Sequence, residues 1–311
     1  MGTGFVWWAR QPILGEEASI DFTVEPGSSV GSAAQQIAGA GVPIDTFLFS
    51  LLARVTRSSA KLKAGTYELK PGVSPLRLID QLVRGEFAQE SLTIIEGWTF
   101  KQMRQAIDAS RGLKHDTAKL SDREVLEKVT PDFRHPEGLF FPDTYLFAKG
   151  ASDLQVYRQA HTMLINHLNA AWEKRDPSLP YSNPYQALVM ASIVEKETGQ
   201  KSERAMIAAV FVNRLKLGML LQTDPTVIYG MGPHYAGKIH KRDLETDTPY
   251  NTYTRSGLPP TPIALPGQQS LAAALAPARV DALYFVSRGN GTSQFSDNLN
   301  DHNRAVNQYQ R

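Results

Sequence analysis

Two glutamates, Glu195 and Glu197, stand close to the end of a long apolar segment. The segment predicts a helix that begins at Pro184, because proline is favoured in the first turn, and that breaks at Gly199. On a helical wheel Glu197 lies in the centre of an apolar stripe, whereas Glu195 points to nearly the opposite side. The stripe consists of Met190, Ile193 and Val194. Desolvation and the negative end of the helix dipole both oppose ionisation there, so Glu197 is a candidate general acid.

An ion pair is the other interpretation of Glu197. Buried glutamates are often simply paired, and Arg204 and Arg214 follow on the next predicted helix, which begins near Ser202 and ends near Leu217. The helical wheel by itself does not decide whether Glu197 is a general acid or a member of an ion pair.

The composition excludes several kinds of site. With 311 residues, 42% of them hydrophobic, the chain can bury a large core, and its length favours two domains. The net charge of +2 comes from scattered lysines and arginines, so nucleic acid is not an expected partner. There are no cysteines, the histidines are dispersed, and no phosphate-binding glycine loop is present. We therefore expect no disulfide, no metal and no cofactor.

A weak internal repeat precedes the glutamate helix. Residues 22–29 and 67–74 share a Pro-Gly turn and recur at an offset of 45 residues. Each copy predicts a strand, a serine N-cap and a short helix, over 30–37 and 75–82, and a poorer third copy follows at 93–107. The pattern resembles the peptidoglycan-binding LysM module, although a generic strand–helix unit would have the same turn.

The N-terminal segment 4–10 is short, aromatic and apolar. Trp7 and Trp8, followed by Arg10, are typical of the last turn of a membrane helix leaving the interface, but the segment is too short to span a bilayer. The alternative is a tail whose aromatic rings pack on the domain.

The rest of the chain predicts a helix over 153–173 and then a loop-rich second half. Near the C-terminus a hairpin pairs 283–287 with 294–295, and a last helix carries His302 and Asn303.

Motifs along nearly the whole chain, from about residue 20, resemble the YceG/MltG family of endolytic murein transglycosylases. They are Ala-Ser-Ile-Val-Glu-Lys-Glu-Thr at 191–198, Val-Asn-Arg-Leu at 212–215, Leu-Gln-Thr-Asp-Pro-Thr-Val-Ile-Tyr-Gly at 221–230, Tyr-Asn-Thr-Tyr at 250–253 and Gly-Leu-Pro-Pro at 257–260. Segments 63–67, 137–145, 266–267 and 299–303 match as well. The run at 222–230 is the most specific part.

The resemblance implies an α+β architecture with three parts. We expect residues 1–17 to be the exit of a membrane anchor and a linker, 18–90 a small LysM-like βα subdomain, and 91–311 a larger mixed α/β catalytic domain. The family implies a single-pass inner-membrane anchor, missing here by truncation, with the catalytic domain in the periplasm. It also implies peptidoglycan glycan strands as substrate, the cell-wall synthesis machinery as a partner, and Glu197 as the catalytic glutamate.

A lytic transglycosylase needs only one acid/base. The C6 hydroxyl of the same MurNAc residue replaces water as the nucleophile and leaves a 1,6-anhydro end, so no second carboxyl group is required. We expect amide and aromatic side chains to line the sugar groove around Glu197. The candidates are Gln222, Asp224, Tyr229, Asn251, Tyr253 and Asn303. Each has a structural alternative, and His302 is left out because it could stabilise a helix terminus.

Two other functions stay open. A hydrolase of the lysozyme type would use Asp224 as its second carboxylate. A peptidoglycan-binding scaffold of the envelope would cleave nothing.

Overall fold

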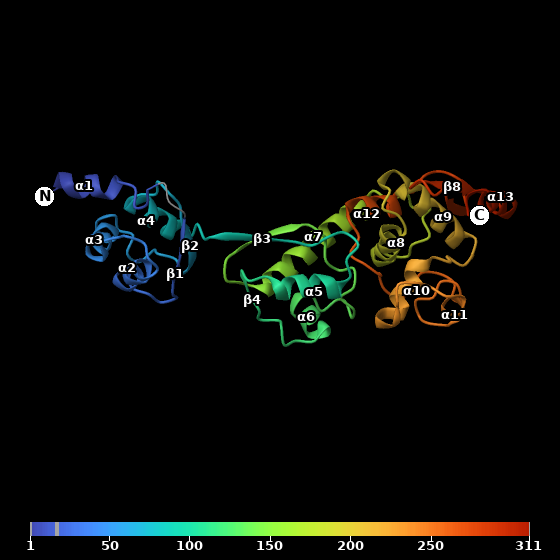
Figure 1. The fold of residues 1–311 in the computed structure, drawn as a ribbon, viewed down its shortest axis with the longest axis horizontal. Helices are drawn as coiled ribbons and strands as arrows, with labels where there is room; N and C mark the ends of the chain where they lie inside the picture. The colour runs from blue at the N-terminus through green and yellow to red at the C-terminus, as the bar shows by residue number, and fades with distance from the viewer. Residues whose placement is uncertain (1, 16–18, 311) are drawn as a thin grey trace. The chain divides into compact units, whose positions relative to one another are not determined.

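The computed structural model describes residues 2–15 and 19–310, which form two compact units (Figure 1). The first unit runs to Leu92 and takes in Ser110–His115 and Leu146–Asp153. The second contains Thr93–Ala109, Asp116–Tyr145 and the chain from Leu154 onward. The expected boundary between residues 17 and 18 lies outside the described residues.

After Leu92 the chain returns to the first unit twice, so a single domain boundary at residue 90 does not describe how the two units divide the chain. Strand β3 (Gln89–Thr93) pairs with β5 (Thr144–Ala148), and the short β4 (Leu113–Lys114) pairs in parallel with β6 (Ala151–Ser152). Strands satisfy their backbone groups on each other wherever they lie in sequence, so such pairing brings distant segments into one unit.

The internal repeat forms the centre of the first unit. Strands β1 (Ile20–Val24) and β2 (Gly65–Leu69) pair antiparallel, with Phe22 opposite Tyr67 and their rings stacked at 5.5 Å. These two aromatic residues occupy the same position in the two copies, so the repeat places equivalent side chains directly across the strand pair.

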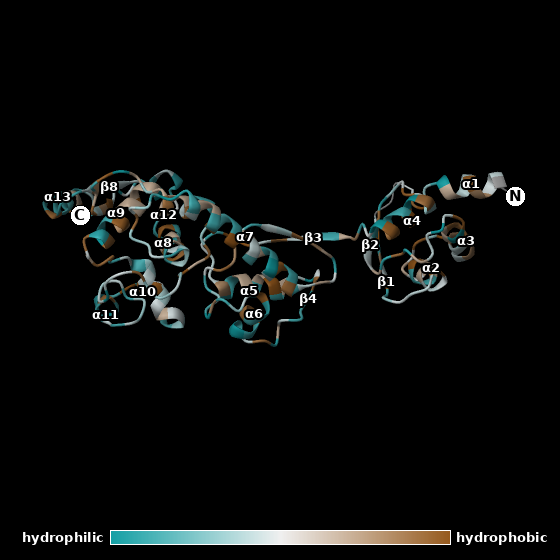
Figure 2. Cartoon of the chain, turned by 180° about the vertical axis from the view of Figure 1, so that it is seen from behind, coloured by the Kyte–Doolittle hydropathy of each residue, from teal (hydrophilic) through white to brown (hydrophobic). Residues whose placement is uncertain are grey.

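The helices of the repeat begin where the sequence predicts. Ser29 accepts a hydrogen bond from the Ser32 amide before α2 (Val30–Gly39), and Ser74 accepts one from the Arg77 amide before α4 (Pro75–Arg84). Both helices bury their apolar sides, and the two faces of α4 separate clearly by hydropathy in Figure 2. Helix α3 (Thr46–Val55) has no counterpart in the second copy.

Helix α1 (Gly2–Arg10) belongs to the core of the first unit. Ala9 is buried, and Phe5 and Trp8 pack against the core that β1, β2 and α2–α4 form. Trp7 is 67% exposed, so the two neighbouring tryptophans have different surroundings. The aromatic segment therefore packs on the domain, which is the alternative that the sequence left open. Among the described residues, no helix is both long enough and apolar enough to cross a membrane.

The second unit is mainly helical. Its larger helices are α5 (Phe100–Ala109), α6 (Asp122–Val129), α7 (Asp153–Glu173), α8 (Pro184–Glu197), α9 (Arg204–Lys216), α10 (Asp224–Met231), α12 (Gln268–Leu275) and α13 (Leu299–Tyr309). Shorter turns are η1 (Lys201–Glu203), η2 (Gly232–His234) and α11 (Lys241–Glu245). The predicted hairpin is present as β7 (Tyr284–Ser287) and β8 (Ser293–Ser296). Helices with two-stranded sheets confirm the α+β class for the described residues.

Helix α8 is the centre of the second unit. Asn183 caps it by accepting a hydrogen bond from the Gln186 amide at 3.0 Å, and Pro184 is its first residue, as predicted. Its last residue is Glu197, two residues before the predicted break at Gly199. All residues from 187 to 194 are buried, because α8 packs against α9, α10 and α12. The helix thus has no solvent face from residue 187 to 194, and it reaches the surface only at its two ends.

Candidate active site

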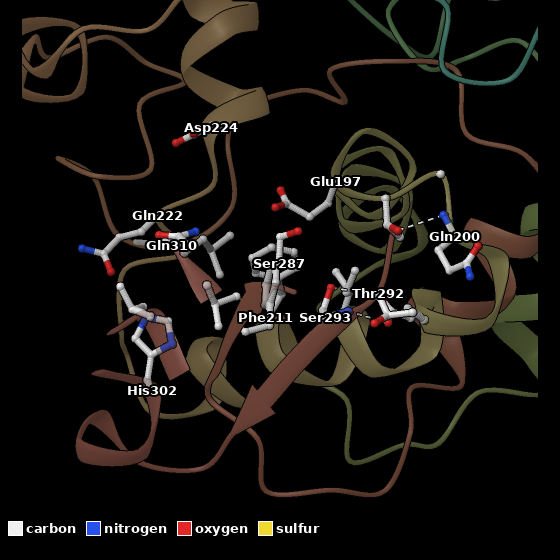
Figure 3. Close-up of a pocket in the computed structure, with 18 of the residues that line it drawn as sticks. Glu197, Gln200, Phe211, Gln222, Asp224, Ser287, Thr292, Ser293, His302 and Gln310 are labelled. Carbon is white, nitrogen blue, oxygen red and sulfur yellow. Dashed lines mark hydrogen bonds between the residues drawn. The ribbon is translucent and has the colours of Figure 1, made fainter. Parts of the chain in front are cut away.

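The C-terminal end of α8 opens into a cavity of about 920 Å³ (Figure 3). Its walls come from α9, the start of α10, the β7–β8 hairpin and α13. Four of the residues expected to act on substrate line it together, namely Glu197, Gln222, Asp224 and Tyr253. Segments far apart in sequence therefore meet around one carboxyl group.

Glu197 is half-buried and has no cation within 4.0 Å among the described residues. Burial raises the pKa of its carboxyl, and the nearby Asp224 carboxylate adds to the increase. The Thr223 hydroxyl donates a hydrogen bond of 2.6 Å to Oε2, which lowers the pKa in part. The position at the last residue of a helix also opposes ionisation. Glu197 is thus arranged to hold a proton beside an open cavity.

Glu195 forms the ion pair that the sequence left open for Glu197. Its side chain is 5% exposed, and Oε1 lies 2.9 Å from Nη2 of Arg204. Its other oxygen accepts hydrogen bonds from the Ser270 hydroxyl and the Gly267 amide. The helical wheel separated the two glutamates by burial, but α8 is buried on all its faces from residue 187 to 194, and the Glu195 side chain is buried as well. What distinguishes them is the arginine.

Asp224 and Tyr253 are joined at the cavity wall. The Tyr253 hydroxyl donates to Asp224 Oδ1 at 2.6 Å, and burial together with that carboxylate raises the pKa of Tyr253. The loop that carries Tyr253 also holds Thr223, whose amide donates to Thr252 Oγ1 at 3.1 Å. The start of α10 and this loop therefore form one hydrogen-bonded block against Glu197.

Gln222 has a strained backbone. Its φ of 52° lies in the left-handed region that non-glycine residues rarely adopt. Its amide donates to the Thr252 carbonyl at 3.1 Å, and its side-chain oxygen accepts from Arg214 Nη1 at 3.3 Å.

Three other candidates do not line the cavity. Asn251 is 1% exposed, and its amide nitrogen donates to the backbone carbonyls of Asp243, Leu244 and Thr246. Asn303 is exposed on α13 outside the cavity, whereas its neighbour His302 lines it. The Asn251 side chain holds the backbone of a loop in place. The exposed side chain of Asn303 contributes nothing to the cavity wall.

Tyr229 lies elsewhere, against a second buried carboxyl group that the sequence reasoning missed. Glu137 is 7% exposed, and its two oxygens accept hydrogen bonds from the Tyr229 hydroxyl at 3.0 Å and from the Phe100 amide at 2.9 Å. Burial raises the pKa of Glu137 to about 7. The only signal for it was its place in the 137–145 motif, because its amide partner comes from a distant helix start.

Other residues beside the cavity or in its wall were also missed. Thr223 lies inside the specific run at 222–230, but no pattern indicates that its hydroxyl meets Glu197. The hairpin contributes Ser287, Thr292 and Ser293 to the cavity wall. The sequence pattern of a hairpin is the same whether or not the hairpin borders a site.

The carboxylates at the cavity wall are held by hydroxyl groups. Thr223 binds Glu197, Tyr253 binds Asp224, and Ser293 donates to Glu203 both by its hydroxyl at 2.8 Å and by its amide at 2.7 Å. This arrangement suits hydrogen bonding with a polyhydroxylated ligand.

Comparison with known proteins identifies relatives of this chain. Residues 22–308 match the sequence model of the YceG-like family. The chain is 33% identical to the endolytic murein transglycosylase of Bacillus subtilis (strain 168), over 94% of this chain and 85% of the relative. It is 28% identical to the endolytic murein transglycosylase of Streptococcus pneumoniae (strain ATCC BAA-255 / R6), of whose length it spans 57%. The crystal structure of a yceG-like protein from Listeria monocytogenes matches with a TM-score of 0.57 and 31% identity, over 93% of this chain and 99% of that one.

Proposed function

Because the chain belongs to the YceG-like family, we propose that it is an endolytic murein transglycosylase with Glu197 as its single acid/base. The observation that carries the assignment of Glu197 is its environment. It is a carboxyl group with a raised pKa, free of any cation within 4.0 Å in the described chain, at the wall of a cavity lined by polar side chains. Glu195, which lies near the end of the same helix, forms an ion pair with Arg204 and does not line the cavity.

In the first step the protonated Glu197 carboxyl gives its proton to the oxygen between MurNAc and GlcNAc. The bond from that oxygen to C1 of MurNAc breaks, the GlcNAc end leaves as an alcohol, and positive charge develops at C1. The raised pKa of Glu197 favours the protonated form, which this step requires.

In the second step the C6 hydroxyl of the same MurNAc attacks C1, and the Glu197 carboxylate accepts the hydroxyl proton. The product is a 1,6-anhydro-MurNAc end, and Glu197 is again protonated. The Thr223 hydroxyl stabilises the carboxylate between the steps, because it donates to Oε2.

The test is product analysis of digested murein with the wild type and Glu197→Gln. We expect 1,6-anhydro ends from the wild type and a loss of at least about 1000-fold in rate for the variant, since the amide neither gives nor takes the proton. Glu127→Gln, an exposed glutamate on α6, is the control and should keep full activity. Full activity of Glu197→Gln would exclude Glu197 as the acid/base.

Hydrolysis of the lysozyme type is the second candidate, because Asp224 lines the same cavity and acts on the pKa of Glu197. Water would then attack C1, and reducing MurNAc ends would replace the anhydro ends. Asp224→Asn separates the two mechanisms: a hydrolase should lose almost all activity, whereas a transglycosylase should keep its product type.

The region 18–90 fits a LysM-like peptidoglycan-binding subdomain in this proposal. The two serine-capped repeat copies and the antiparallel pair β1–β2 support it. Retention of Glu197→Gln on purified sacculi, with and without residues 1–90, tests this role. Equal retention of both forms would contradict it.

A further inference from the structure

Arg214 is a buried arginine without a carboxylate partner, and it lies in the wall of the cavity that Glu197 faces. Only 8% of the residue is exposed, and among the described residues no carboxylate lies within 4.0 Å of its guanidinium. Arg204, on the same helix and 5% exposed, pairs with Glu195 at 2.9 Å. Buried charges are normally paired, so the contrast between two arginines of one helix points to an anion that the chain itself does not supply.

The hydrogen bonds of Arg214 leave one amino group of its guanidinium without an acceptor in the described part of the chain. A guanidinium has five N–H donors. Nε donates to the Leu283 carbonyl at 2.7 Å, and Nη1 donates to the Leu220 and Leu221 carbonyls and to Gln222 Oε1. Nη2 donates to no group in the described part of the chain. The carbonyls fix the guanidinium in place, while both N–H groups of Nη2 stay available to a ligand.

The neighbours of Arg214 in the wall are also arranged for a ligand. Gln222 keeps its left-handed backbone although this is unfavourable, and strained residues of this kind cluster at ligand-binding positions. His302 stacks on the Tyr284 ring, and burial together with the charge of Arg214 lowers its pKa, which favours the neutral imidazole. Figure 3 shows Gln222 and His302 at one side of the cavity, with Glu197 facing the same space.

No carboxylate of the cavity wall pairs with the Arg214 guanidinium. Glu197, Asp224 and Glu203 each accept a hydrogen bond from a hydroxyl group of the chain. Arg214 is thus the buried cation of the wall, and its charge is unmatched by the acids that share the cavity.

We propose that Arg214, with Gln222 and His302, forms a subsite for a carboxylate that the substrate carries on the muramyl residue beside the cleaved bond. The inference rests on the proposed function. Guanidinium groups recognise carboxylates by charge and by fixed N–H geometry. Murein offers this chemistry from two sources: the lactyl carboxylate of a peptide-free MurNAc, and the carboxylates of an attached peptide. The subsite would orient the muramyl residue so that its C1 faces Glu197.

The test compares three forms of the same glycan strands. The first carries its peptides, the second has been stripped to free lactyl carboxylates, and in the third the stripped carboxylates are capped as methylamides. For the wild type we expect kcat/KM for formation of anhydro ends to fall about tenfold or more from the second form to the third, the loss typical of one charge-assisted hydrogen-bonded pair. Cleavage of the first form relative to the second shows which carboxylate the subsite prefers.

Variants locate the effect at Arg214. Arg214→Gln should cleave uncapped strands as poorly as the wild type cleaves capped ones and should be insensitive to capping, whereas Arg214→Lys should recover part of the preference. Arg304→Gln removes one exposed positive charge from α13 outside the cavity and should leave the preference unchanged. If Arg214→Gln does not fold, the substrate series with the wild type still decides the question.

Equal cleavage of capped and uncapped strands by the wild type would overturn the subsite. A wild type that cleaves no strand would overturn the proposed function instead. In that case the dissociation constants of Glu197→Gln for the three forms test the subsite by themselves: weaker binding of the capped form supports it, and equal binding rejects it.

Discussion

Thr223 is, among the described residues, the side chain that hydrogen-bonds the carboxyl of Glu197. Its hydroxyl stabilises the carboxylate and so lowers the pKa that burial has raised. An acid acts in its protonated form, so its activity falls as pH rises through its pKa. Burial and Thr223 therefore act in opposite directions on the pH at which the alkaline limb of the activity profile lies.

We expect Thr223→Val to move that alkaline limb to higher pH, because loss of the hydrogen bond raises the pKa of Glu197 further. The rate near neutral pH should fall about tenfold, since the carboxylate formed in the first step loses its donor. The measurement is kcat against pH. Thr223→Ser keeps the hydroxyl and should keep the wild-type profile; an unshifted limb in Thr223→Val would contradict the assignment.

Glu137 is the other buried acid of the second unit, and its effect is on stability. Its pKa rises from an ordinary 4.5 to about 7 in the folded chain. Between these values the folded protein binds one proton more than the unfolded chain, so this residue makes stability fall as pH rises from about 4.5 to 7. The amount is roughly 3 kcal/mol, from 1.36 kcal/mol per pKa unit.

The variant Glu137→Gln stays neutral at every pH and should lack this dependence. Measured by urea unfolding at pH 5 and pH 8, its free energy of unfolding relative to the wild type should improve by roughly 3 kcal/mol at the higher pH. Glu124→Gln, an exposed acid in the capping box of α6, serves as the control. A difference that is the same at both values of pH would show that Glu137 is ionised in the folded chain.

At the scale of elements, the block of α10 and the loop before Arg255 positions Thr223, which contacts Glu197, and two cavity residues, Asp224 and Tyr253. Asn251 holds the loop by donating to three backbone carbonyls, and its side-chain oxygen accepts from the Tyr253 amide at 2.8 Å. The block thus depends on a buried amide that does not itself reach the cavity.

Two asparagines that the sequence treated alike should consequently behave differently. Asn251→Ala leaves buried carbonyls without donors and should cost roughly 3 kcal/mol in the free energy of unfolding, with a loss of activity because Tyr253 is displaced. Asn303→Ala, on the exposed side of α13, should change stability by less than about 0.5 kcal/mol. Denaturant unfolding and kcat/KM of both variants check this, and equal effects would show that burial does not separate them.

At the scale of the whole molecule, the first unit has a core of its own. All residues of that core come from α1 to Phe87. The segments that return from later in the chain, 110–115 and 146–153, add strand pairs but contribute no residue to this core.

A fragment of residues 1–90 should therefore fold by itself, with a cooperative urea transition followed by circular dichroism. A fragment of residues 11–90 should be less stable by roughly 3 kcal/mol, because it loses the apolar area that Phe5, Trp8 and Ala9 bury. Coincident transitions of the two fragments would mean that α1 only lies on the surface. Absence of a transition in the longer one would show that the returning segments are required.

Much of this protein follows from local sequence. The serine caps of α2 and α4, the start of α8 at Pro184 and the C-terminal hairpin depend on neighbouring residues, and all are found where the pattern predicts. Helix α8 ends at Glu197, close to the predicted break at Gly199. Helix ends and turns are decided within a few residues, so the sequence alone determined them. The motif of Glu197 was visible for the same reason.

Only the tertiary structure decided what surrounds each side chain. It placed Arg204 against Glu195 and left Glu197 facing a cavity, although both glutamates end one buried helix. It also joined Glu137 to Tyr229 and left Arg214 without an acid. A pKa, an ion pair or a cavity wall depends on atoms brought together from distant segments, and a local pattern carries no information on which segments meet.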